Sequence, residues 1–197
     1  MASRRHAEAP CHSPVSSAVS GAAAAAARQN DSYYHGSERE RELGWTLYEG
    51  DDYHSKESID KMARGEPLTD QDRIPWLLQL HGIIQREITS KANAIVLCSA
   101  LKRAYRQMLL FGRTCLPSSD SPTAVDGVWF AFLHGPFKLI QERLEAREGH
   151  YMSAALLQSQ FDTLEPPVDT ENAFSVDVQR SIPEVASDIE SALSVRL

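Results

Sequence analysis

The sequence lacks the features of several large protein classes. Its three cysteines, Cys11, Cys98 and Cys115, lie far apart and outside any CxxC pair. An odd number of scattered cysteines argues against a disulfide framework and a zinc site, and it fits a reducing compartment. No stretch approaches the roughly 18 consecutive apolar residues of a membrane span, and no apolar signal segment follows the basic start. We therefore expect no membrane partner.

Positive charge is also in short supply. The formal net charge is −7, and the lysines and arginines are scattered along the chain. Binding to a nucleic acid backbone requires clustered cationic side chains that neutralise several phosphates. The composition therefore excludes nucleic acid as an expected partner.

The N-terminal segment differs in composition from the rest. Alanine and serine dominate its first 30 residues, and Glu8 is the only acid among them. This bias is typical of a mitochondrial transit peptide, but also of a disordered low-complexity tail with no large apolar face to bury. We favour a disordered segment over residues 1–41 and a cytoplasmic location, with a mitochondrial one as the alternative. A single domain is expected over residues 42–197.

Strands and helices are predicted to alternate along the domain. Apolar runs of strand length and helical three- and four-residue spacings follow one another. The expected strands are 45–48, 94–98, 128–133 and 174–178, and the expected helices are 74–89, 101–110, 137–147, 154–163 and 182–193. Such alternation indicates an α/β fold with a parallel sheet and flanking helices.

Polar clusters that follow the strands are the candidate site residues, because ligands of such sheets bind beyond the carboxyl ends of the strands. The first cluster runs from Glu49 through Asp51 to His54. Its carboxylates could hold Mg²⁺ or accept a hydroxyl proton. The alternative is an acidic loop in which an aspartate or Ser55 caps a helix.

Basic residues make up the remaining clusters. Arg73 lies just before a helix, in a segment that could also be a capped helix start. Lys102 and Arg106 are one helical turn apart, which fits an anion site or, more often, a solvated helix face. Arg143 and Arg147 are four residues apart and precede a glycine. That spacing fits a mobile lid that carries arginines, or an exposed helix laced with ion pairs.

Taken in order, these clusters resemble one family. The matching blocks include Gly50–His54, Gly65–Leu77, Cys98–Lys102 with Tyr105 and Arg106, Arg147–His150 and Gln158–Pro167. The chain from about Glu42 onward resembles the gluconokinase family. The resemblance implies a P-loop kinase with a sheet of the nucleoside-kinase type. It also implies transfer of the ATP γ-phosphoryl group to the 6-hydroxyl of D-gluconate, with Mg²⁺.

Roles for individual residues follow from the resemblance alone. Asp51 is expected to orient or deprotonate the acceptor hydroxyl, and Glu49 with Asp51 to hold Mg²⁺. Four residues are expected in the substrate pocket, namely His54, Arg73, Lys102 and Arg106. Arg143 and Arg147 are expected to clamp ATP phosphates from the lid. The implied partners are gluconate and ATP, and a homodimer stays open.

The sequence departs from the family near its start. Members begin with an apolar strand and G-x-x-x-x-G-K-[ST], whose amides and lysine cradle phosphates, and this sequence contains no such motif. We therefore expect the first central strand to be missing. An empty slot, or irregular contacts of the N-terminal segment, should separate 94–98 from 128–133. The alternative to an active kinase is an inactive protein, from a mis-predicted or truncated gene product or a pseudokinase, that at most binds sugar acid or pairs with an intact member.

Overall fold

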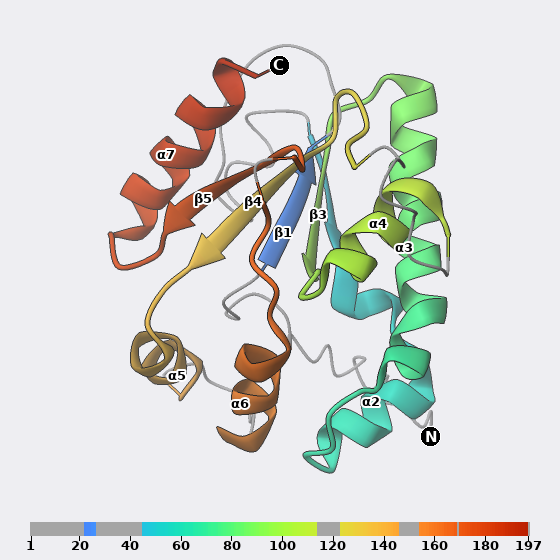
Figure 1. Cartoon of the computed structure of the whole chain (residues 1–197), viewed down its shortest axis with the longest axis vertical. Coiled ribbons are helices and arrows are strands. Elements are labelled where there is room, and N and C mark those ends of the chain that lie inside the picture. The colour runs from blue at the N-terminus through green and yellow to red at the C-terminus, as the bar shows by residue number, and fades with distance from the viewer. Residues whose placement is uncertain (1–21, 27–44, 114–122, 146–153, 169, 197) are drawn as a thin grey trace, which may run out of the picture.

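A five-stranded sheet forms the centre of the molecule (Figure 1). The computed structural model describes residues 22–26, 45–113, 123–145, 154–168 and 170–196. The strand order is β2-β3-β1-β4-β5. The strands are β1 (Ala22–Ala26), β2 (Thr46–Glu49), β3 (Ala94–Ser99), β4 (Trp129–His134) and β5 (Ala173–Asp177).

The four strands expected from the sequence are confirmed, each within one residue of its predicted position. β2 pairs in parallel with β3, and β4 pairs in parallel with β5. The apolar run of β3 is buried on both faces. Val96 packs into the core under α3 and α4, whereas Ile95 packs with Leu193 of α7. A strand covered on both sides needs apolar residues at successive positions, which is why its sequence does not alternate.

The centre of the sheet contradicts the expectation of a slot or irregular contacts. Ala22–Ala26 lies between β3 and β4 as a regular strand, and it runs antiparallel to both. Two facing strand edges leave rows of unpaired amide and carbonyl groups, which are costly to bury. Any backbone other than that of proline can satisfy them, so this position of the sheet needs paired amides and carbonyls more than particular side chains. The missing β-branched residues therefore did not leave the position empty.

The direction of β1 decides where its two ends lie. Ala22 is opposite Ser99, the last residue of β3, whereas Ala26 is opposite Trp129, the first residue of β4. β1 therefore begins beside the carboxyl ends of the parallel strands. It ends beside their amino ends. The domain boundary predicted at residue 42 is not tested, but part of the segment on its N-terminal side belongs to the sheet.

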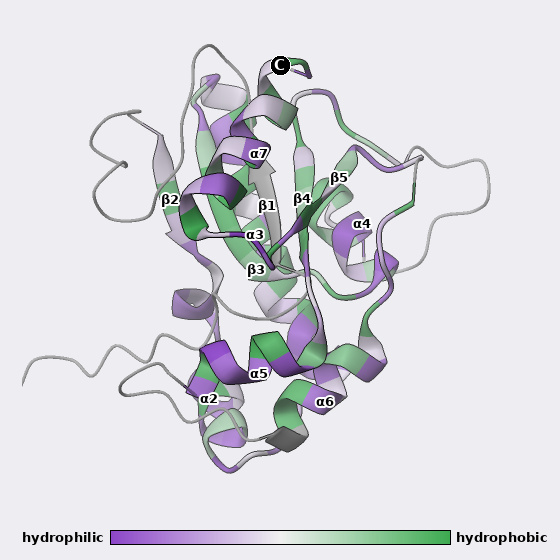
Figure 2. Ribbon diagram, turned by 90° about the vertical axis from the view of Figure 1, so that its left-hand side faces the viewer, coloured by the Kyte–Doolittle hydropathy of each residue, from purple (hydrophilic) through white to green (hydrophobic). Residues whose placement is uncertain are grey.

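Helices cover both faces of the sheet. α3 (Asp70–Ser90) and α4 (Arg103–Phe111) pack over one face, and α7 (Ile182–Ser194) packs over the other (Figure 1). α2 (Lys56–Ala63), α5 (Phe137–Glu145) and α6 (Ala154–Thr163) gather at the end of the sheet where β3, β4 and β5 finish. Figure 2 shows the same grouping from the side, with the apolar strands enclosed between helices. Within the described residues, no helix is long and apolar enough to cross a membrane.

Caps explain where the helices near the carboxyl edge begin. The Ser55 side chain accepts a hydrogen bond from the Ser58 amide and starts α2. Thr69 and Asp72 form a reciprocal capping box that starts α3 four residues before the predicted Ile74. Pro75 lies inside α3, at its sixth residue, so the helix continues past a position that has no amide to donate to the Gln71 carbonyl. α2 was not predicted as an element, since it is short and half of its residues are charged.

Candidate functional site

The site lies where β2 ends against β3. A single 3-10 turn, η1 (Gly50–Tyr53), follows Glu49. A Cβ atom on Gly50 would lie 2.4 Å from the carbonyl oxygen of Leu97, so only glycine allows this approach to β3. The Trp76 indole Nε1 donates to the Gly50 carbonyl at 2.6 Å. Together these contacts hold the turn that carries Asp51 between the sheet and α3.

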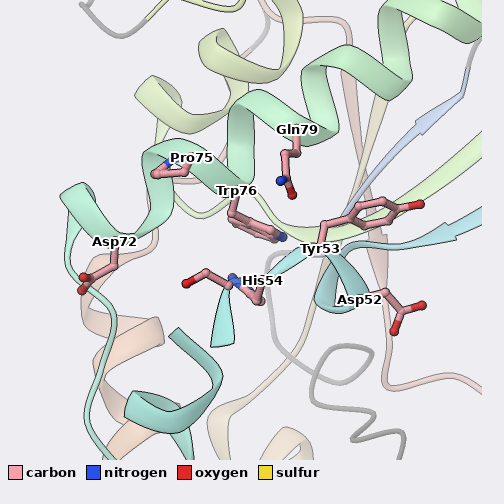
Figure 3. A pocket seen from close by; sticks show the side chains of 8 residues that line it. Asp52, Tyr53, His54, Asp72, Pro75, Trp76 and Gln79 are labelled. Carbon is pink, nitrogen blue, oxygen red and sulfur yellow. The ribbon is translucent and has the colours of Figure 1, made fainter. Parts of the chain in front are cut away.

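His54 is held directly after this turn. Its ring stacks on Trp76, with the ring centroids 4.4 Å apart and an angle of 17° between the planes (Figure 3). Only 4% of its side chain is exposed. Burial, together with the positive charge of Arg73, lowers the pKa of His54 to about 4, so the ring is neutral at pH 7. Its Nδ1 has no hydrogen-bond partner within the described part of the chain.

Asp51 lies beside His54. One carboxylate oxygen is 3.8 Å from the His54 Nε2, and 16% of the aspartate side chain is exposed. The aspartate and the imidazole are therefore neighbours at the end of β2. Glu49 ends β2 immediately before the turn. No group of three or more potential metal ligands occurs among the described residues.

Arg73 supplies a positive charge next to this pair. The residue is buried, with 7% of its surface exposed. The one hydrogen bond of its side chain to the described residues is long, from Nε to the Leu68 carbonyl at 3.4 Å, and its guanidinium carbon lies 5.8 Å from the Tyr105 ring centroid. No carboxylate in the described residues forms an ion pair with it. Burial lowers its pKa, although an arginine stays charged at neutral pH.

A cavity of about 290 Å³ opens between η1 and α3 next to the stacked rings. Its wall consists of Asp52, Tyr53, His54, Ser55, Asp72, Pro75, Trp76 and Gln79. In Figure 3 the Asp52 carboxylate points away from His54. The side chains of Trp76 and Gln79 extend from α3 toward the side where His54 lies. The cavity therefore gives access to the buried imidazole from one side.

Lys102 lies at the same edge but has an acidic partner. Its Nζ donates to both carboxylate oxygens of Asp70, at 2.7 and 2.9 Å. The Tyr105 hydroxyl donates to the same carboxylate at 2.5 Å. These donors lower the pKa of Asp70, while burial and the bond to Asp70 raise that of Tyr105. The ammonium group is thus already neutralised.

Arg106 is buried, with 1% of its surface exposed, and its polar partners lie on other segments than the turn. It forms a two-pronged ion pair with Glu171, with Nε to Oε2 at 2.7 Å and Nη2 to Oε1 at 3.0 Å. Its Nη1 donates to the carbonyls of Ala100 and Glu165. All three guanidinium nitrogens therefore have protein partners, so the structure does not bring Arg106 together with Asp51 and His54.

Of the two arginines expected on a lid, the structure describes only Arg143. Arg143 lies on α5, at the carboxyl end of the sheet, and donates a long 3.4 Å bond to the Arg180 carbonyl. Arg147 lies outside the described residues. The structure therefore leaves the lid as a prediction.

Curated relatives of the chain come from animals and bacteria. The mouse protein named probable gluconokinase is 45% identical over 156 residues, which span 77% of this chain and 85% of that protein. Thermoresistant gluconokinase of Escherichia coli is 39% identical over 157 residues, 78% of this chain and 82% of the relative. The chain belongs to the gluconokinase family. No family model matches it.

Solved structures of gluconokinase type agree with the fold. A gluconokinase from Sinorhizobium meliloti superposes with a TM-score of 0.62 at 35% identity, covering 79% of this chain and 81% of the other. A sugar kinase from Janibacter superposes with a TM-score of 0.64 at 36% identity, covering 79% and 83%. The expected kinase family and fold class are both confirmed.

Trp76, Tyr105 and Asp70 are site residues that sequence reasoning did not single out. Trp76 and Tyr105 lie inside blocks that match the gluconokinase family, but each occupies an apolar position on a helix. Such positions are usually core, and both residues are indeed buried. Their polar roles, a hydrogen bond to Gly50 and one to Asp70, depend on contacts between segments distant in the sequence.

Proposed function

We propose that this chain binds D-gluconate at the carboxyl edge of β2 and phosphorylates its 6-hydroxyl from ATP. Relatives named gluconokinase support the substrate and the reaction. Among the contacts of the site, the proposal is carried by the buried Arg73, which has no acidic partner within the described ranges. It marks a place that favours an anion, and the sugar acid supplies one.

The energetics of Arg73 support a carboxylate ligand. A buried charge without a partner is strongly unfavourable, because the protein interior does not replace its hydration. One weak backbone hydrogen bond and one aromatic ring recover only part of that cost. A carboxylate matches the planar guanidinium with two parallel hydrogen bonds. Binding of gluconate would thus complete an interaction that the free protein leaves open.

His54 and Asp51 suit the hydroxyl groups of the substrate. A neutral imidazole has one N–H donor and one lone pair, so His54 can bind a hydroxyl as donor or acceptor. The Asp51 carboxylate can only accept, which suits the orientation or deprotonation of the 6-hydroxyl as it attacks phosphorus. Catalysis of phosphoryl transfer is largely positioning and charge neutralisation. We assign Asp51 to the acceptor hydroxyl and His54 to substrate binding.

Mg²⁺ fits the donor set as a nucleotide-bound ion. The carboxylates of Glu49 and Asp51 are hard oxygen ligands at the tip of β2, and Mg²⁺ at kinase sites takes one or two carboxylates plus phosphate oxygens. When bound, the ion would neutralise charge on the phosphates. Arg143, which lies on α5, and Arg147 are proposed to do the same.

A coupled assay of gluconate-dependent ADP formation tests the proposal. We expect turnover by the purified chain above a heat-killed control. Asp51→Asn should lower kcat by at least about a hundredfold at similar gluconate affinity, as expected for loss of a general base. Arg73→Met should raise the KM for gluconate by at least about tenfold. Unchanged gluconate binding in Arg73→Met would contradict the proposed carboxylate site.

Binding without transfer is the second candidate function. It is favoured by the absence of G-x-x-x-x-G-K-[ST] from the sequence and by the antiparallel direction of β1, which carries Ala26 away from the site edge. Separate calorimetric titrations with gluconate and with ATP distinguish the two candidates. Gluconate binding without ATP binding supports the second candidate. Micromolar ATP binding supports the kinase.

A further inference from the structure

We infer that Lys102 is a positioning residue that withholds the Asp70 carboxylate from Arg73 and thereby keeps the Arg73 guanidinium available for an anionic ligand. The identity of that ligand, gluconate, rests on the proposed function. The role of Lys102 rests on the contacts among Asp70, Lys102, Tyr105 and Arg73.

Asp70 is the carboxylate best placed to neutralise Arg73. The two residues are three positions apart on α3, so their side chains are neighbours on one helix face. Asp70 is close enough to act electrostatically on Arg73. An aspartate and an arginine at this spacing are able to pair. Here they do not, although Arg73 is buried and in need of a partner.

The reason is that Asp70 is already bound from another helix. Lys102 immediately precedes α4 and binds both oxygens of Asp70, and Tyr105, one turn along, binds one of them. The Lys102 Nζ also lies 5.5 Å from the Tyr105 ring centroid, close to the 5.8 Å of the Arg73 guanidinium carbon. Both cations therefore contact one ring, but the carboxylate goes to the lysine.

The other acid near Arg73 provides an internal control. Asp72 is bound by Lys61, with Nζ to Oδ2 at 2.6 Å, and by Thr69 in the capping box. Asp72 directly precedes Arg73, and consecutive residues on a helix do not face each other. Release of Asp72 from its lysine should therefore leave Arg73 unpaired, whereas release of Asp70 should not. The described residues thus contain two similar lysine–aspartate pairs. Both aspartates act electrostatically on Arg73, but only Asp70 has the helical spacing to form an ion pair with it.

Calorimetric titration of D-gluconate into five proteins tests the inference. These are the unmodified chain, Lys102→Met, Asp70→Asn, the double variant Lys102→Met/Asp70→Asn, and Lys61→Met. We expect Lys102→Met to weaken binding by about tenfold or more, because Asp70 then pairs with Arg73. The double variant should recover to within about threefold of the unmodified chain, and Lys61→Met should stay within the same range.

Two outcomes of the titrations would overturn the inference. A double variant as weak as Lys102→Met would mean that Lys102 contacts the ligand itself. Equal losses in Lys61→Met and Lys102→Met would mean that only the net positive charge of the region matters. If Lys102→Met fails to fold, Lys102→Arg keeps the pair to Asp70 and should bind gluconate normally. Weak binding by folded Lys102→Arg would likewise overturn the inference.

A crystal structure of ligand-free Lys102→Met separates this inference from the proposed function. We expect the Arg73 guanidinium to lie within about 4 Å of the Asp70 carboxylate, the usual limit of an ion pair. Arg73 left in its present position would overturn the inference. If the unmodified chain does not bind gluconate, the proposed substrate is wrong, and this structure still decides whether Lys102 controls the pairing of Asp70.

Discussion

His54 and Arg73 have both lost most of their contact with water, and burial lowers the pKa of each. The consequence differs because their ordinary pKa values differ. The imidazole drops well below neutral pH and loses its charge, while the guanidinium stays protonated. One polar neutral group and one cation therefore lie side by side. This combination suits a ligand that carries both hydroxyl groups and a carboxylate.

The lowered pKa of His54 makes stability depend on pH. In the unfolded chain the imidazole takes up a proton near its ordinary pKa of 6.5, but in the folded protein only near about 4. As the pH falls from 6.5 toward 4, the unfolded state binds more protons, so the free energy of unfolding decreases. We expect a His54-dependent loss on the order of 1–2 kcal/mol between pH 7 and pH 5. Urea denaturation of the unmodified chain and of His54→Gln at both pH values measures it. Identical pH slopes for the two proteins would contradict the assignment.

The junction of β2, η1 and α3 is the element-level basis of the site. Gly50 allows the chain to cross β3 at close range, and its carbonyl accepts the Trp76 indole that stacks on His54. A displacement of this turn would move Asp51 and His54 together.

Gly50→Ala should therefore destabilise the fold and damage the site. The new Cβ would meet the Leu97 backbone oxygen at 2.4 Å, and a backbone atom cannot turn aside as a side chain can. We expect a loss of about 1–3 kcal/mol in chemical denaturation, typical of overpacking, together with weaker gluconate binding. The matched control is Gly82→Ala within α3, where an added Cβ would have no atom within 4 Å apart from the helix's own nearby backbone. It should stabilise by up to about 1 kcal/mol through helix propensity. Equal effects of the two substitutions would exclude the close approach as the cause.

The ion pair between Arg106 and Glu171 fastens α4 to the segment before β5. Removal of one partner leaves the other charged and buried, so Arg106→Met should cost about 3–5 kcal/mol of unfolding free energy. Arg106→Met/Glu171→Met removes both charges and should recover much of that loss. The same double variant, once folded, should bind gluconate as the unmodified chain does. A selective loss of gluconate affinity would restore Arg106 to the substrate pocket, where the family resemblance placed it.

For the whole molecule, the decisive feature is the alanine strand in the centre of the sheet. Ala24 pairs with Leu97 on one side and with Ala131 on the other, so β1 connects the β2-β3 half to the β4-β5 half. The backbone pairing of β1 on both of its sides is therefore what joins the two halves of the sheet.

Two substitutions of Ala24 test how much the backbone hydrogen bonds of β1 stabilise the sheet. Ala24→Pro removes an amide from the middle of the sheet and should cost several kcal/mol, about 3 or more, with loss of a single cooperative transition. Ala24→Gly keeps the amide and should cost only about 1 kcal/mol through chain entropy. Thermal unfolding followed by circular dichroism compares them. A proline variant as stable as the glycine variant would show that β1 does not bridge the two halves.

Much of the fold could be predicted because its signals are local. The apolar run from Ala94 to Cys98 and the helical spacing from Ile74 to Ile88 each depend on a few neighbouring residues. The start of α3 at Asp70 was missed because Thr69 and Asp72 stabilise a polar first turn without an apolar stripe. The site cluster at Asp51 and His54 was also recognisable, since it directly follows a strand.

The sequence alone determined the family, the order of the four parallel strands along the chain and the cluster of polar residues at the end of β2. Tertiary structure decided which basic residues are free to bind. Arg73, Lys102 and Arg106 look alike in the sequence, but only Arg73 lacks a carboxylate partner within the described residues, because Asp70 and Glu171 reach the other two from distant segments. It also decided that Ala22–Ala26 forms the central strand. An unpaired strand needs backbone amides and carbonyls to pair with, and these do not depend on the side chains of the partner. The spacing of charged residues along the sequence cannot show which of them form ion pairs between distant segments.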